Sequence, residues 1–234
     1  MYRFSIPQRE LEENAFGIDN IELKDGAFGK LLCEMTPAEI EEVRNRLILG
    51  RKRIVLYTVT VPYDRLDLYR EIFRKAMLLR IEHIKICLCV LTDTSEKTLE
   101  SLKTIASYAE ACSIPVLFEP RAKYPLFTYE WYGKYRTDWT GIVFDPLECV
   151  KEDKNPFLTV LYKNKYRHDV KFLRIHDGLY GGGEPTLPEM GNAEIKECTS
   201  ALLAFGFDGY FSLREYGVDQ KACLDAFLQM LTRM

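Results

Sequence analysis

Charged side chains stand at the ends of several apolar runs, where they could hold a metal ion, a substrate or one another. The segments "VLFEP" and "IVFDP" are alike, since each apolar run ends in one carboxylate, Glu119 or Asp145, followed by a proline. A buried strand gains nothing from such a carboxylate unless it meets a cation, a hydrogen-bond donor or water. Because other runs end in arginine and histidine, we expect a joint site. The polar strand ends are Glu22 with Lys24, Glu119, Asp145 with Glu148, Arg174 with His176, and Arg214.

The order of segments along the chain predicts a scaffold that would gather these ends. Short β-branched runs alternate with longer segments of helical period, which favours parallel strands covered by helices. We expect strands over residues 3–6, 20–24, 53–57, 83–91, 115–119, 141–145, 171–176 and 209–213. We expect helices over residues 37–49, 64–80, 95–111, 192–205 and 219–231.

Eight predicted strands favour a closed (β/α)₈ barrel, the TIM-barrel class of α/β folds, as a single domain over residues 1–234. The competing fold is an open doubly wound sheet, which often carries a glycine-rich turn after its first strand. Here the first strand continues into "IPQRELEEN", which contains no glycine. The closed barrel is therefore preferred, and function is expected at the carboxyl ends of its strands.

Composition narrows the partners and the compartment. The net charge is −3, with acidic and basic residues spread along the chain, so nothing indicates a nucleic-acid partner. No apolar segment approaches the roughly 20 residues needed to cross a bilayer, so no membrane partner is expected. The start, "MYRFSIPQRELEEN", lacks the apolar region of a signal peptide, and we expect a cytoplasmic location. A small molecule is the expected partner, and a homo-oligomer is left open.

Two segments allow alternative interpretations. The aromatic stretch "KYPLFTYEWYGKYRTDWT", residues 123–140, is either a stacking wall for a sugar or base, or a helix packed on the barrel or a neighbouring subunit. The helix is favoured, because the barrel needs a covering helix there. The glycines of "GLYGGGEP" suggest a phosphate-binding loop or a flexible loop over the barrel mouth. The flexible loop is favoured, since no Gly-Lys-Ser/Thr follows.

The segment "FLRIHDGLYGGGEPTLPEMGNAEIKECTSALLAFGFDGYFSLREY", in which "GFDGY" precedes the last predicted strand, carries a family resemblance. It resembles the xylose isomerase-like TIM barrels of the sugar-phosphate isomerase/epimerase superfamily, which also includes endonuclease IV. The strand order matches over nearly the whole chain, whereas the specific motifs lie in residues 170–216. The resemblance implies a divalent metal held by Glu, Asp, His and Glu on strands five to eight. The two glutamates of that set also act as the acid/base pair.

Only half of that ligand set is present in this chain. Glu119 and Asp145 match the first two ligands. Counting back from Asp177, the family's histidine falls on Arg174 and its lysine on His176. Counting forward from the last glycine of "GFDG", its second glutamate falls on Arg214. The Asp-x-x-His that often contacts substrate reads Asp145-Pro-Leu-Glu148.

Arginine stays protonated and has no lone pair to offer, so it is a poor metal ligand. We therefore expect no metal, with Arg174 and Arg214 replacing its positive charge beside Glu119 and Asp145. Their guanidinium forks suit carboxylates, phosphates and sugar acids equally well. A manganese, zinc or magnesium ion on Glu119, Asp145, Glu148 and His176 remains the alternative.

The resemblance and these residues predict an isomerase- or epimerase-like protein that moves a proton on a small sugar, sugar phosphate or sugar acid. The expected catalytic residues are Glu119 as base, Asp145, and His176 as proton carrier; the expected substrate-binding residues are Lys24, Glu148, Arg174 and Arg214. The alternative is a non-catalytic carbohydrate-binding or regulatory barrel. An apurinic endonuclease is disfavoured, because three histidines in the chain cannot build its histidine-rich zinc cluster.

Overall fold

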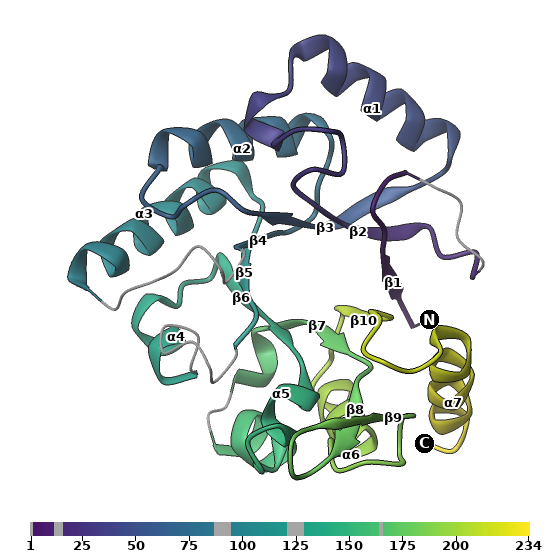
Figure 1. Cartoon of the computed structure of the whole chain (residues 1–234). Helices are drawn as coiled ribbons and strands as arrows, with labels where there is room; N and C mark the ends of the chain where they lie inside the picture. The colour runs from purple at the N-terminus through teal and green to yellow at the C-terminus, as the bar shows by residue number, and fades with distance from the viewer. Residues whose placement is uncertain (1, 12–15, 87–94, 121–128, 164–165) are drawn as a thin grey trace. The chain divides into compact units, whose positions relative to one another are not determined.

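The chain folds as a (β/α)₈ TIM barrel, as the sequence predicts. The structure is a computed structural model that describes residues 2–11, 16–86, 95–120, 129–163 and 166–234 (Figure 1). Eight parallel strands follow the order β1-β10-β7-β6-β5-β4-β3-β2 in a closed barrel, and β8 and β9 form a separate two-stranded sheet. No helix among these residues is long and apolar enough to cross a membrane.

The elements lie close to their predicted positions. The barrel strands are β1 (Phe4–Pro7), β2 (Asn20–Lys24), β3 (Arg53–Val59), β4 (Ile84–Ile86), β5 (Val116–Phe118), β6 (Thr140–Phe144), β7 (Val170–Arg174) and β10 (Tyr210–Ser212). The helices are α1 (Pro37–Leu49), α2 (Leu66–Leu78), α3 (Glu96–Cys112), α4 (Tyr129–Tyr135), α5 (Pro146–Val150), α6 (Ile195–Ala204) and α7 (Gln220–Thr232). The predicted strand 83–91 is described only as β4, because residues 87–94 lie outside the described residues.

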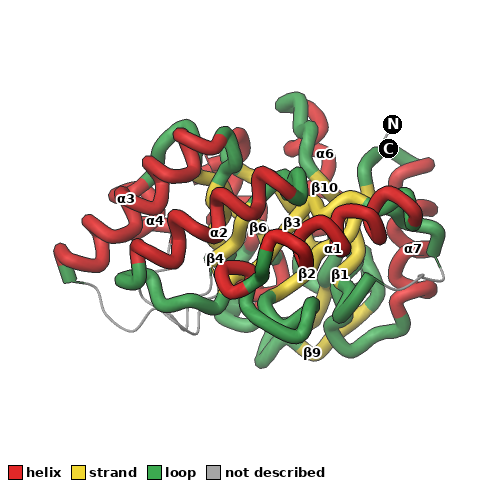
Figure 2. Tube along the Cα trace, turned by 90° about the horizontal axis from the view of Figure 1, so that it is seen from above, coloured by secondary structure: helices red, strands yellow, loops and turns green. Residues whose placement is uncertain are grey.

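The described chain divides into two compact units, and each is presented by itself. One unit comprises Ser5–Phe118 and Glu130–Gly141. Its strands pair in parallel, with Ile21 beside Ile54 and Ile84 beside Val116. Helices α1, α2 and α3 lie along the outer side of strands β2, β3 and β4 (Figures 1 and 2).

Local sequence explains where α1 of this unit begins. Thr36 accepts a hydrogen bond from the Glu39 backbone amide, and the Glu39 carboxylate accepts one from the Thr36 amide at 2.6 Å. This reciprocal capping, with Pro37 in the first turn, satisfies amides that a helix start leaves without partners. In α4, Tyr132 and Tyr135 are buried, and the Tyr135 ring lies 4.7 Å from the Phe118 ring. These two rings therefore pack as the favoured covering helix requires.

The other unit comprises Met1–Phe4, Glu119–Tyr129 and Ile142–Met234. Its strands β6, β7 and β10 pair in parallel, with Phe144 beside Leu173 and Arg174 beside Ser212. Gly209 stands just before β10, and a Cβ there would collide with the backbone carbonyl of Lys171. The close approach of β7 and β10 thus requires glycine at this position.

The segment after β7 differs from the prediction. The expected strand 171–176 ends at Arg174, and a new strand, β8 (Asp177–Leu179), pairs in antiparallel fashion with β9 (Glu184–Thr186). Gly181, Gly182 and Gly183 all have positive φ and form the turn of this hairpin. The glycines therefore serve a tight connection, for which left-handed backbone is needed, where the sequence favoured a flexible loop over the barrel mouth.

Candidate functional site

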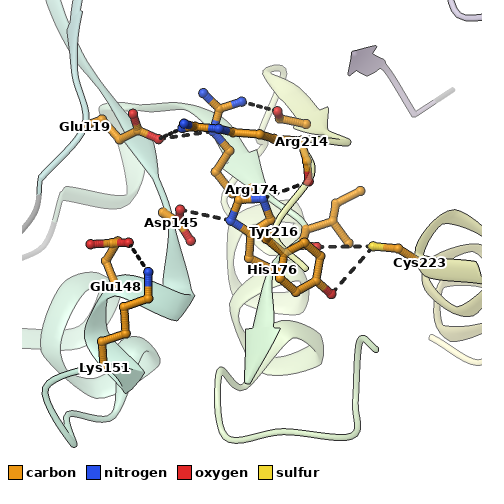
Figure 3. Close-up of polar contacts among 11 residues, drawn as sticks. Glu119, Asp145, Glu148, Lys151, Arg174, His176, Arg214, Tyr216 and Cys223 are labelled. Atoms are coloured by element: carbon orange, nitrogen blue, oxygen red, sulfur yellow. Dashed lines mark hydrogen bonds and ion pairs between the residues drawn. The ribbon is translucent and has the colours of Figure 1, made fainter. Parts of the chain in front are cut away.

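The second unit brings five predicted site residues together: Glu119, Asp145, Arg174, His176 and Arg214 (Figure 3). Asp145 directly follows β6, Arg174 is the last residue of β7, and Arg214 follows the end of β10 by two residues. Parallel neighbouring strands that end together deliver these side chains to one place.

Both arginines contact the same carboxylate oxygen. Arg174 Nε donates to Glu119 Oε1 at 3.2 Å, and Arg214 Nη1 donates to that atom at 3.4 Å (Figure 3). Glu119 and Arg174 are 3% and 2% exposed, whereas the Arg214 side chain is 40% exposed. Arg174 Nη1 also donates to the buried hydroxyl of Ser212. One guanidinium is thus fixed inside the protein and the other remains accessible.

His176 joins a carboxylate to the backbone. Its Nδ1 lies 2.9 Å from Asp145 Oδ2, and its Nε2 lies 3.1 Å from the backbone oxygen of Arg214. Burial raises the pKa of Asp145, but the charge and hydrogen bond of His176 outweigh it, so the net pKa lies below its ordinary value. Both ring nitrogens therefore face an oxygen, one of a carboxylate and one of the backbone.

A tyrosine ring packs against the ring of His176. The Tyr216 ring stacks on His176 with ring centres 4.4 Å apart and planes 29° from parallel. Its hydroxyl donates to the backbone oxygen of Thr186 in β9 at 2.6 Å. Burial raises the pKa of Tyr216, so the phenol stays neutral. The two rings therefore hold one another in place by stacking.

One polar atom of the site has no partner within the described part of the chain. Asp145 Oδ1 is fully buried and accepts no hydrogen bond there, although the other oxygen of the same carboxylate is bound to His176. Leaving a buried carboxylate oxygen without a donor costs free energy. Asp145 Oδ1 is therefore an acceptor that the described residues leave unused.

Three other polar residues that the sequence places at strand ends have contacts of their own. Glu148 is paired with Lys151 at 2.7 Å on α5 (Figure 3). Glu22 and Lys24 belong to the other unit, where Glu22 accepts a hydrogen bond from Ser5 at 2.7 Å and Lys24 is exposed. The structure thus gives Glu148 a local partner, and the substrate role of Lys24 stays a prediction.

Sequence reasoning missed two residues that complete the site, Ser212 and Tyr216. Ser212 is the last residue of β10 and lies two residues before Arg214, so the alternation of the predicted strand, continued to Arg214, could have placed both on one side. Tyr216 follows the strand in "REYG", where no local pattern indicates that its ring returns to His176. Asp177, buried beside the site, accepts hydrogen bonds from the amides of Gly178, Gly191 and Ala193.

The cluster does not fit the divalent ion that the resemblance implies. Among the described residues, no three His, Cys, Asp or Glu side chains gather in a way that could hold a metal. Both ring nitrogens of His176 are engaged, one by Asp145 and the other by the backbone oxygen of Arg214. Glu119 Oε1 is directed at two guanidinium groups, and Glu148 is paired with Lys151. The alternative metal set of Glu119, Asp145, Glu148 and His176 is therefore not assembled.

Comparison with known proteins shows likeness in structure rather than in sequence. No family model matches the chain, and no curated protein matches it. A protein from Mycobacterium smegmatis, a xylose isomerase-like TIM barrel in complex with magnesium, has a TM-score of 0.74 at 14% identity over 99% of this chain and 96% of that one. The fold is that of the xylose isomerase-like TIM barrels.

Two further structures agree with this assignment. A xylose isomerase domain protein from Planctomyces limnophilus has a TM-score of 0.73 at 13% identity, covering 99% of this chain and 96% of its own. D-psicose 3-epimerase with D-tagatose, from Clostridium cellulolyticum H10, has a TM-score of 0.70 at 13% identity, covering 99% and 97%. Likeness at this identity shows the xylose isomerase-like fold, and a fold by itself does not fix an activity.

Proposed function

We propose that this xylose isomerase-like barrel binds a small carbohydrate carrying an anionic group and moves a proton between two of its carbons. Glu119 is the base, and guanidinium groups supply the positive charge that the resemblance assigns to a metal. One observation carries the proposal: Arg174 and Arg214 share one oxygen of Glu119. The base and its stabilising cations are thus already in contact.

The reaction follows from this arrangement. The Glu119 carboxylate takes a proton from the carbon beside a carbonyl group, and the electron pair of that C–H bond moves to the carbonyl oxygen as an enediolate. The adjacent guanidinium groups stabilise this negative charge. Glu119 then returns the proton to the neighbouring carbon, while the hydroxyl proton of the substrate passes from that oxygen to the former carbonyl oxygen, so that the carbonyl group and the hydroxyl group exchange places. Because one base acts on one face of the sugar, we propose isomerisation in preference to epimerisation, which needs a second base on the opposite face.

The remaining residues bind and orient the substrate. Arg214 is the accessible cation, and its guanidinium group lies beside that of Arg174, which favours an anionic sugar such as a sugar phosphate or sugar acid. Asp145 Oδ1 accepts a hydrogen bond from a substrate hydroxyl. His176, which we expected to carry a proton, has both nitrogens engaged, and its proposed role is to position Asp145. D-psicose 3-epimerase and a D-tagatose 3-epimerase-like protein are among the similar solved structures, which supports a carbohydrate as the class of substrate.

A non-catalytic carbohydrate-binding barrel is the second candidate. It is favoured by one observation: Glu119 is buried and already paired with two guanidinium groups. A carboxylate held in this way is a weaker base, since protonating it would remove the negative charge that faces both guanidinium groups. A cytoplasmic location and the oligomeric state stay predictions under either function.

The two candidates are separated by proton exchange. Protein dialysed against chelator is screened by thermal shift with aldose and ketose phosphates and sugar acids, and binders are incubated in deuterated water and followed by NMR. We expect deuterium at the carbon beside the carbonyl, and a loss of about 10²-fold or more in Glu119→Gln.

Glu152→Gln removes a partly exposed carboxylate that is paired with Lys154 outside the cluster, and it should leave exchange unchanged. Binding without exchange would support the non-catalytic barrel. Exchange that appears only after manganese or magnesium is added would refute the replacement of the metal by arginine.

A further inference from the structure

A cleft of about 590 Å³ lies in the first unit, between the carboxyl-terminal ends of α1 and α2 and the start of β3. We call it the basic cleft, because its charged lining consists of Arg44, Arg51, Lys52, Arg53 and Arg80, opposed by Glu82 alone. The protein as a whole has a net charge of −3. This concentration of positive charge is therefore local.

The positive charges of the basic cleft are mostly not neutralised. Arg53 donates to the neutral side chain of Asn20 at 2.8 Å, and Lys52 donates to the neutral side chain of Gln8 at 3.2 Å. Arg44 is paired with Glu41 at 3.3 Å in an exposed contact. Such an exposed pair is weak and is easily exchanged for a stronger anion.

Arg51 and Arg80 occupy equivalent positions, each two residues beyond the last residue of its helix. Both have left-handed backbone, with φ of 52° and 54°, a conformation that glycine or asparagine usually supplies at a helix end. Neither side chain has a hydrogen bond or ion pair with any residue that the structure describes. The helix dipole explains a cation near a helix end, but not two unpaired guanidinium groups beside one cleft.

The rest of the cleft is apolar. Leu47 and Leu79 are buried beneath it, at 6% and 4% exposure, whereas Ile48 and Leu78 are 64% and 50% exposed at its sides. Exposed aliphatic side chains next to guanidinium groups offer a surface for a flat ring, which both can contact. The cleft thus combines anion recognition with an apolar wall.

We propose that the basic cleft binds a nucleotide, with the phosphates on the arginines and the base against Ile48 and Leu78. Guanidinium forks match phosphate oxygens in pairs. The volume lies in the range of small-molecule sites, roughly 300–1,000 Å³. Arg53 is the first residue of β3, so the cleft is at the amino end of that strand. TIM barrels hold their substrates at the carboxyl ends, and the nucleotide site is therefore distinct from the proposed carbohydrate site and independent of it.

The test is calorimetric titration of the full chain with ADP, inorganic pyrophosphate and adenosine at low and at physiological salt. ADP should bind more tightly than either fragment, and its affinity should fall as salt rises. Arg51→Asn with Arg80→Asn removes both charges while keeping residues that tolerate left-handed backbone. This double variant should weaken ADP binding about tenfold or more. Ile48→Ser should weaken ADP but leave pyrophosphate unchanged.

Arg74→Gln is the matched control, since it removes an arginine of α2 that pairs with Glu71 and does not line the cleft. Its ADP affinity should equal that of the wild type, with circular dichroism showing that each variant is folded. The proposal is overturned if folded wild-type protein does not bind ADP, or if the double variant binds it equally well. Binding to phosphatidylserine vesicles with no ADP binding would overturn it in favour of a membrane surface.

Discussion

Arg174 and Arg214 offer a matched pair of perturbations, because both donate to one oxygen of Glu119 at 3.2 and 3.4 Å. At these distances the Coulomb energy of each pair is about 5 kcal/mol for an effective dielectric constant of 20. Distance alone therefore predicts nearly equal effects when either arginine is replaced. Burial predicts unequal ones, since the Arg174 side chain is 2% exposed and that of Arg214 is 40% exposed.

We expect Arg174→Met to lower the free energy of unfolding by about 3 kcal/mol or more, because it removes the buried cation that faces the buried carboxylate of Glu119. Arg214→Met should cost about 1 kcal/mol or less, since water screens the exposed pair. Adding Glu119→Gln should recover most of the loss in Arg174→Met, because no buried charge is then left uncompensated. The free energy of unfolding is measured by urea unfolding at pH 7. The wild type, Arg174→Met, Glu119→Gln and the double variant form a double-mutant cycle, and Arg214→Met is measured beside them.

Two outcomes would refute this reasoning. Equal costs for Arg174→Met and Arg214→Met would show that burial does not distinguish the two pairs. A double variant whose cost is the sum of the single costs would show that Arg174 and Glu119 do not stabilise one another.

Two other perturbations test the surroundings of the site. The pKa of Asp145 is lower in the folded protein than in the unfolded chain, where it is about 3.9. The ionised carboxylate therefore stabilises the fold at pH values above the unfolded pKa, and this stabilisation is lost as the pH falls through the folded pKa. Asp145→Asn should therefore be less stable than wild type at pH 7 in thermal unfolding, and a gap that fails to narrow below about pH 4 would contradict the assignment. Gly191→Ala places a Cβ against the Asp177 carboxylate and the Gly178 backbone and should cost about 1–3 kcal/mol in urea unfolding. Gly50→Ala, whose nearest neighbour is an oxygen at 3.2 Å, should cost less, and the reverse order would show that the Asp177 loop is not tightly packed.

The amino-acid sequence predicts where the barrel strands end, but it does not predict the structure of the connections that follow them. Alternating strand and helix patterns predict the barrel, and the position of Arg174 relative to "HDG" predicts that it meets Glu119, because parallel strands end together. The β8–β9 hairpin is not predicted, since its strands are three residues each and enclose a run of glycines. Such short strands carry no periodic signal. Likewise the contact of Tyr216 with His176 depends on a turn after β10, which is set by tertiary packing rather than by local pattern.

Asp177 fastens both ends of the segment that contains the hairpin, since its carboxylate accepts hydrogen bonds from the Gly178 amide at one end and from the Gly191 and Ala193 amides at the other. The Asn192 amide adds a bond to the Gly178 carbonyl at 2.7 Å. The segment between Gly178 and Gly191 is thus held at both ends. The tip of its hairpin can therefore become longer or shorter, or change in composition, without a change in the path of β7. Selectivity for different ligands can therefore diversify at the tip while the charged residues at the base stay the same.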